Sequence, residues 1–217
     1  MNKRILGAIC LIASFFNTAL AQGLQLDTIL LLNSQKVYGK VIDTTKNLVK
    51  YQYIGKKGKQ FESGIETERV FSIKYADGKE SLLYSPDSTN DEEFSVEDMR
   101  YFIKGQQDAY EHYKTKKSFY TGIGMGLVGT YVVTPMVILS PVVPGIYSFV
   151  NGSRWMKIKK MKGATAEDLT KDTYLMGYTK VVRNKRIQSS LKGSAIGLAV
   201  GITTMYIFRD QRIGLFD

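Results

Sequence analysis

Cysteine and histidine are almost missing from this chain, with one of each in 217 residues, at Cys10 and His112. Cys10 falls inside a predicted secretory signal peptide at residues 1–21, which has Lys3 and Arg4 before an apolar core and a small-residue cleavage site after it. The rest of the chain therefore has no thiol for a disulfide, for catalysis or for a cysteine-based metal site. His112 alone supplies too few ligands for a metal, and a helix-surface position is the favoured interpretation.

Catalytic motifs are also missing. The sequence contains no nucleophile elbow, zinc motif or phosphate loop in a fitting context. We therefore expect a protein that is not an enzyme, with no catalytic, cofactor-binding or metal-binding residues.

Charge is missing from two long stretches. Residues 118–153 contain no Asp, Glu, Lys, Arg or His over 36 positions, and residues 193–208 contain none over 16. A membrane-spanning helix needs about 20 apolar residues. Pro135, Pro141 and Pro144 disfavour one straight helix through the first stretch. Two alternatives remain open, a single span kinked near Pro135 or two short helices that turn back as a hairpin.

The charge between these stretches favours two spans. Residues 154–192, a basic loop followed by a helix, carry 11 Lys and Arg against three Asp and Glu. Positive loops stay in the cytoplasm, so one Pro-kinked span at 118–153 and a second membrane helix at 193–208 fit best, with a tail at 209–217. The expected location is the bacterial inner membrane with the N-terminal domain in the periplasm, and membrane lipids are the expected partners.

The N-terminal part predicts a small all-β domain at residues 22–84, either a curled sheet or SH3-like. Six short runs rich in β-forming residues are separated by turn residues, among them Asp77-Gly78. The runs cover residues 28–32, 36–43, 48–54, 59–66, 69–75 and 80–84. Tyrosines and lysines are interleaved in these runs, and a small basic β domain with exposed aromatic residues can bind nucleic acid. In an exported protein we expect instead that the tyrosines pack across strands and the lysines face solvent, with no nucleic-acid partner.

Residues 85–94 are expected to be a linker, because they combine proline, small polar residues and an acidic run. Ser95 and Asp98 resemble a capping box and predict an amphipathic helix over residues 95–117. The overall expectation is an α+β membrane protein.

Glycines at four-residue spacing mark the predicted membrane helices. Gly193, Gly197 and Gly201 share one helix face in the second stretch. In the first stretch, Gly122 and Gly126 repeat this spacing, and Gly129 is close by. Small residues at this spacing allow helices to approach closely in lipid, so these six glycines are predicted to pack as a glycine zipper, against each other or against another copy.

The order of segments resembles a group of uncharacterised exported membrane proteins of Bacteroidota. The matching patterns are DTILLLNSQKVYGKV (27–41), GQQDAYEHYK (105–114) and DTYLMGYTK (172–180), followed by a basic run and a glycine-spaced helix. The resemblance implies an envelope protein and carries no known activity. Asp108 and Tyr178 lie in the motif-like segments and are candidate interface residues, although helix capping and packing explain them as well.

These observations favour a non-enzymatic, membrane-anchored envelope protein whose β domain is an interaction or assembly module. A protein partner or self-association through the glycine-lined helices is expected. The alternative is a small oligomeric channel, transporter or membrane-remodelling component, although neither uncharged stretch carries the ionisable residue that transport paths usually contain.

Overall fold

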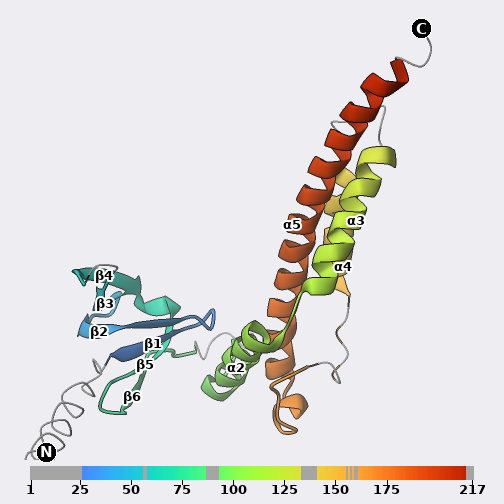
Figure 1. The fold of residues 1–217 in the computed structure, drawn as a ribbon. Coiled ribbons are helices and arrows are strands. Elements are labelled where there is room, and N and C mark those ends of the chain that lie inside the picture. Colours follow the sequence, from blue (N-terminus) through green and yellow to red (C-terminus); the bar gives the residue numbers. More distant parts are fainter. Residues whose placement is uncertain are drawn as a thin grey trace, which may run out of the picture. The chain divides into compact units, whose positions relative to one another are not determined.

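The computed structural model describes residues 26–55, 58–86, 93–132, 141–154, 156, 158 and 161–213 (Figure 1). The chain forms two compact units, residues 1–93 and residues 94–217. The predicted signal peptide lies outside the described residues, as do most of the predicted linker, residues 133–140 of the first uncharged stretch and the last four residues of the tail.

The first unit is one antiparallel sheet of six strands in the order β4-β3-β2-β1-β5-β6. The strands are β1 Asp27–Leu31, β2 Lys36–Thr44, β3 Leu48–Ile54, β4 Gln60–Glu66, β5 Val70–Lys74 and β6 Glu80–Leu82. Their ends lie within two residues of the predicted β-rich runs. Register shifts at Leu30/Leu31 and at Val41/Asp43 mark irregularities of the kind that bend a sheet.

The core of this β unit is formed by side chains of β1, β3 and β5. Its buried members are Ile29, Leu31, Val49, Val70 and Ile73. The buried carboxylate of Asp27 joins three parts of the sheet, since it accepts hydrogen bonds from the Val41 N–H at 2.7 Å and the Ala76 N–H at 2.8 Å. A buried acid is tolerated here because backbone donors satisfy it.

The second unit is helical and is built along one very long helix. Its elements are α2 Val96–His112, α3 Lys116–Val132, α4 Val142–Ser153, a short 3-10 turn at Asp168–Thr170 and α5 Asp172–Ile213. With 42 residues, α5 is about 63 Å long at about 1.5 Å per residue. The Ser95 hydroxyl accepts a hydrogen bond from the Asp98 N–H at 3.1 Å, so the predicted N-cap is present at α2.

Three helices lie along α5 (Figure 1). Successive contacts of α2 and α3 advance along α5 in the same direction, from Gly105 beside Tyr174 to Gly126 beside Ser194. α4 runs the opposite way, because Ser148 bonds to Ser190 while the later Gly152 packs on the earlier Ile187. α3 and α4 are therefore antiparallel neighbours along α5.

This arrangement corrects the predicted membrane architecture. Among the described residues, none of the helices combines the length and the apolar composition that a membrane crossing requires. The two-span membrane region is therefore wrong, and so are the transmembrane glycine zipper and the inner-membrane location that depended on it.

The physical reason lies in how the uncharged stretches are divided. The first is not one Pro-kinked helix, since α3 has 17 residues, α4 has 12, and the two run in opposite directions. The second is the later part of α5, and the same helix begins in the basic segment at Asp172.

Candidate functional site

The predicted packing glycines lie where α3 meets α5. A Cβ atom added at Gly122 or Gly126 would overlap the backbone carbonyls of Ser190 and Ser194. Added at Gly193 or Gly197, it would overlap the carbonyls of Phe119 and Ile123. At Gly201 it would come within 2.6 Å of the Thr130 hydroxyl, while Gly129 is buried on α3. These glycine faces are thus occupied by the contact within the unit and are not available to a second copy.

Two further glycines, which the sequence pattern did not predict, make the same kind of contact between α2 and α5. A Cβ at Gly105 would overlap the Tyr174 carbonyl, and one at Gly177 would overlap the Phe102 carbonyl. Neither has another glycine four residues away, so spacing offered no signal. The backbones of both α2 and α3 therefore approach the backbone of α5 closely.

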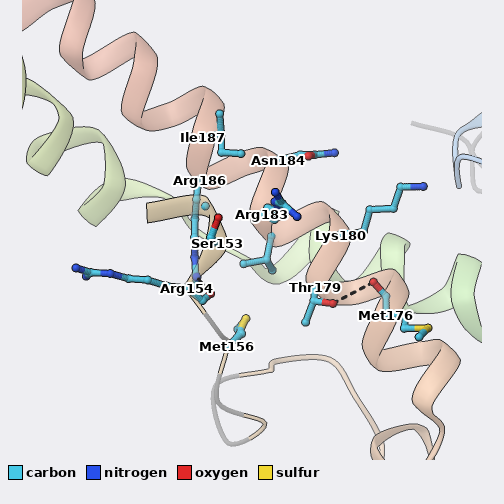
Figure 2. A pocket seen from close by; sticks show the side chains of 12 residues that line it. Ser153, Arg154, Met156, Met176, Thr179, Lys180, Arg183, Asn184, Arg186 and Ile187 are labelled. Carbon is cyan, nitrogen blue, oxygen red and sulfur yellow. Dashed lines mark hydrogen bonds between the residues drawn. The ribbon is translucent and has the colours of Figure 1, made fainter. Parts of the chain in front are cut away.

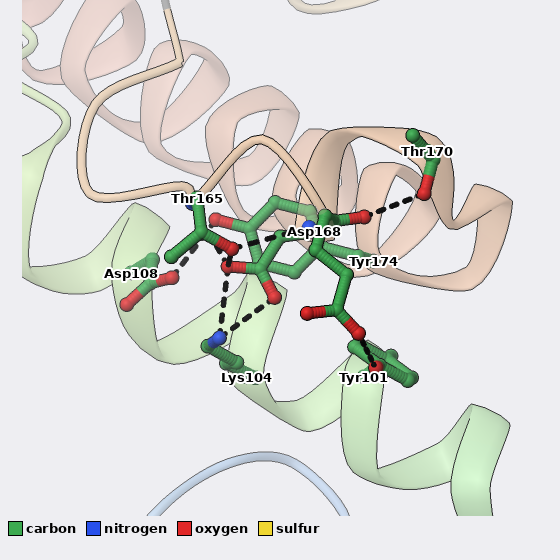
Figure 3. A network of polar contacts seen from close by, with 8 residues as sticks. Tyr101, Lys104, Asp108, Thr165, Asp168, Thr170 and Tyr174 are labelled. Carbon is green, nitrogen blue, oxygen red and sulfur yellow. Dashed lines mark hydrogen bonds and ion pairs between the residues drawn. The ribbon is translucent and has the colours of Figure 1, made fainter.

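Hydrogen bonds and an ion pair connect residues 165–168, which precede α5, to α2 (Figure 3). Asp168, only 1% exposed, pairs with the Lys104 ammonium at 2.7 and 2.8 Å. The same carboxylate accepts hydrogen bonds from the Thr165 N–H at 2.9 Å and the Thr165 hydroxyl at 2.7 Å. Burial raises the pKa of Asp168, but the bonds from Lys104 and Thr165 outweigh burial and hold it below its usual value.

Asp108 and Tyr178 lie at the edge of this network without bonding to each other. Asp108 accepts a hydrogen bond from the buried Tyr174 hydroxyl at 2.8 Å. The Tyr178 hydroxyl accepts one from the Lys162 N–H at 3.2 Å. Tyr174 was not singled out from the sequence, although it stands four residues before Tyr178 and so shares its helix face.

The chemistry of this cluster favours a structural role. Burial raises the pKa of Tyr174 and of Tyr178, so both phenols keep their protons at neutral pH. Asp168 has its charge matched by Lys104, and the tyrosines pack with Ala109, Val181 and Val182 in the helical core. Across the described part of the chain, His, Cys, Asp and Glu side chains form no group of three that could hold a metal ion.

An open pocket of about 600 Å³ lies between the end of α4 and the first half of α5 (Figure 2). Four cationic side chains line it, from Arg154, Lys180, Arg183 and Arg186, and none of its lining residues is acidic. The remaining lining is mixed, with Thr179 and Asn184 beside apolar Met176, Val182 and Ile187. The sequence indicated the positive charge of this region but not its gathering around a pocket.

A broad apolar surface covers the second half of the helical unit. We call the described residues 118–132, 141–153 and 193–207 the apolar segment. Large apolar side chains stand exposed on all three of its helices, up to 62% for Ile146 on α4 and 72% for Tyr206 on α5. The others are Tyr120, Val128, Tyr131, Val142, Phe149, Val150, Ile196, Val200, Ile202 and Ile207.

The aromatic residues of the β unit form a smaller group. The Tyr53 ring stacks on Phe61, with ring centroids 5.8 Å apart, and makes a tilted contact with Tyr51 on the same strand at 5.9 Å. Tyr53 and Phe61 face each other across the two strands and remain partly exposed. This is the cross-strand packing expected from the sequence. An interaction role for the β unit stays a prediction.

No protein-family profile, curated protein or solved structure matches this chain.

Proposed function

We propose that this chain is a non-enzymatic interaction module that assembles with further copies of itself through the apolar segment. The observation that carries the proposal is the exposure of large apolar side chains on α3, α4 and α5 together. Extended apolar patches on a protein surface mark interaction sites, because covering them removes apolar area from water.

A second copy is the occupant that fits this surface. The segment contains no Asp, Glu, Lys, Arg or His, so two copies can pack there without burying a charge. The exposed apolar residues lie on three helices, so a partner with an extended surface is needed to cover them. A small ligand would cover only a part of this apolar surface. The glycine faces are already used inside the unit, so the outward-facing Ile146, Phe149 and Tyr206 are the contacts expected between copies.

Sedimentation of the full chain across a concentration series tests this proposal. We expect a concentration-dependent oligomer that the double substitution Ile146→Glu/Tyr206→Glu converts to monomer, because each glutamate would have to lose its hydration at the interface. Ile42→Glu is the matched control, since Ile42 is 53% exposed on β2, outside the apolar segment, and should leave assembly unchanged.

Two results would contradict the proposal. One is a wild-type chain that stays monomeric at every concentration, and the other is a double variant that assembles as the wild type does. Far-ultraviolet circular dichroism of each variant checks that helicity is retained. The positions substituted are already exposed to water, so little change is expected.

A further inference from the structure

The pocket at the end of α4 concentrates positive charge, and among the described residues that line it there is no carboxylate. Most of the chain's formal charge of +10 lies in the helical unit, where residues 94–217 contain 18 Lys and Arg against nine Asp and Glu. Within the described residues, no ion pair is formed by Arg154, Lys180, Arg183 or Arg186. Like charges gathered at one site repel, and a bound anion relieves that repulsion.

Aromatic and backbone contacts set the positions of these cations. The Arg183 guanidinium lies 5.7 Å from the Phe149 ring centroid, and the Lys180 ammonium lies 5.4 Å from that of Phe102. Arg186 is held more firmly, because it donates to the Tyr113 hydroxyl at 2.7 Å and to the Arg154 carbonyl at 2.8 Å. Figure 2 shows Arg183 in the middle, with Lys180 and Arg154 reaching to opposite sides.

This arrangement leaves donors for a ligand. Arg154, Lys180 and Arg183 are exposed, so their long side chains can turn toward an anion without breaking an ion pair. Guanidinium groups present paired N–H donors that match the oxygens of a phosphate, and several cations suit a doubly charged group better than a carboxylate.

The rest of the pocket indicates what the anion is attached to. Met156, Met176, Val182 and Ile187 line it beside the cations, and its volume of about 600 Å³ is in the usual range for small-molecule sites. We propose that this pocket binds a phosphate monoester carried on an apolar body, with Arg183 as its central contact and Arg154 and Lys180 on either side. A soluble alkyl phosphate and the headgroup of a phosphatidic acid share this chemistry.

Calorimetry on the full chain at constant ionic strength tests the inference. The probes are hexyl phosphate, hexyl sulfate, and phosphatidylcholine vesicles with and without phosphatidic acid. We expect saturable binding of hexyl phosphate, of phosphatidic acid vesicles or of both, with hexyl sulfate weaker because it carries a single charge. Binding of hexyl phosphate alone identifies a soluble ligand, and binding of the vesicles alone identifies a lipid headgroup.

Two variants separate the pocket from general attraction to a basic protein. Arg183→Gln should weaken binding at least tenfold, whereas Lys192→Gln should leave it unchanged. Lys192 is exposed on the same helix and carries the same charge, but it does not line the pocket. Equal losses in the two variants, or no saturable binding of any phosphate probe, would overturn the inference. Arg183 lies outside the apolar segment, and the variants used for sedimentation, Ile146→Glu and Tyr206→Glu, leave its contact with the Phe149 ring in place, so either proposal can fail without the other.

Discussion

Asp168 shows what a single buried charge does in this protein. The 3-10 turn and the start of α5 are held against α2 through its contacts to Lys104 and Thr165. Because its pKa is lowered in the fold, the folded state binds a proton at Asp168 less readily than the unfolded chain does. The charged carboxylate therefore contributes stability above its unfolded pKa, near 3.9, and this contribution is lost as pH falls through the folded pKa.

We therefore expect Asp168→Asn to lower the free energy of unfolding by about 1–3 kcal/mol at neutral pH, because it removes the charged partner of Lys104. The difference from the wild type should shrink as the pH falls below the unfolded pKa, near 3.9, toward the lower folded pKa of Asp168. Urea unfolding at several pH values measures this. Thr170→Val is the control, because its hydroxyl bonds only the exposed Glu167 carbonyl in the same turn. A difference that does not vary with pH would show that the charge of Asp168 is not responsible.

The glycines of α3 offer a test with a control on the same helix. Gly126→Ala would place a Cβ against the Ser194 carbonyl and force α3 away from α5, so we expect a loss of about 1–3 kcal/mol. Gly124→Ala meets nothing within 4 Å and should stabilise the helix by up to about 1 kcal/mol. Thermal unfolding followed at the helical signal compares the two. If both variants shift the midpoint alike, close approach at Gly126 does not matter for stability.

At the scale of elements, the end of α2 depends on a side chain from α5. The Lys185 ammonium donates to the carbonyls of Ala109, Tyr110 and Tyr113 at 2.7–3.2 Å, which completes the last turn of α2. Burial lowers the pKa of Lys185, so the contact is made at some cost in hydration.

Lys185→Met keeps the aliphatic part of the side chain and removes these donors. We expect a loss of about 1–2 kcal/mol in unfolding free energy and faster amide hydrogen exchange in the last turn of α2. Lys192→Met, at an exposed position of the same helix, should change neither quantity. Unchanged exchange in α2 after Lys185→Met would contradict the capping role.

The elements also differ in how well local pattern determined them. The six strands were predictable because short runs rich in β-forming residues are separated by turn residues such as Asp77-Gly78. The α2 N-cap at Ser95 was predictable for a similarly local reason. The division of residues 118–153 into α3 and α4 does not follow from the sequence alone, because prolines mark where a helix is disturbed and do not specify the direction in which the chain continues.

For the whole molecule, two separate cores predict two separate unfolding transitions. The β unit packs around Ile29 and Ile73, and the helical unit around Tyr174 and Tyr178. Asp27→Asn replaces one of the two carboxylate oxygens that accept from the Val41 and Ala76 N–H groups, so one of these donors loses its acceptor. This substitution should lower the unfolding temperature of the β unit only. Gly126→Ala should lower the transition of the helical unit only. Scanning calorimetry of both variants checks this, and a common shift of both transitions would show that the units unfold as one.

Local sequence patterns were enough to predict the strand positions, the helix that begins after Ser95, the positive charge of residues 154–192, and the glycines at the α3–α5 contact. Each of these follows from residues that are near one another in the chain. The three-dimensional packing of the helices was needed for two further features: α5 continues unbroken from Asp172 through the uncharged stretch, and α2 and α3 lie in series along it. The packing of the helices also brings Lys104 against Asp168, and it places Arg154 and Arg183 in one pocket. Neither pairing could be predicted from the local sequence. The physical reason is that these contacts join residues about 30 to 65 positions apart, and their partners are selected by packing against α5 and not by spacing along the chain.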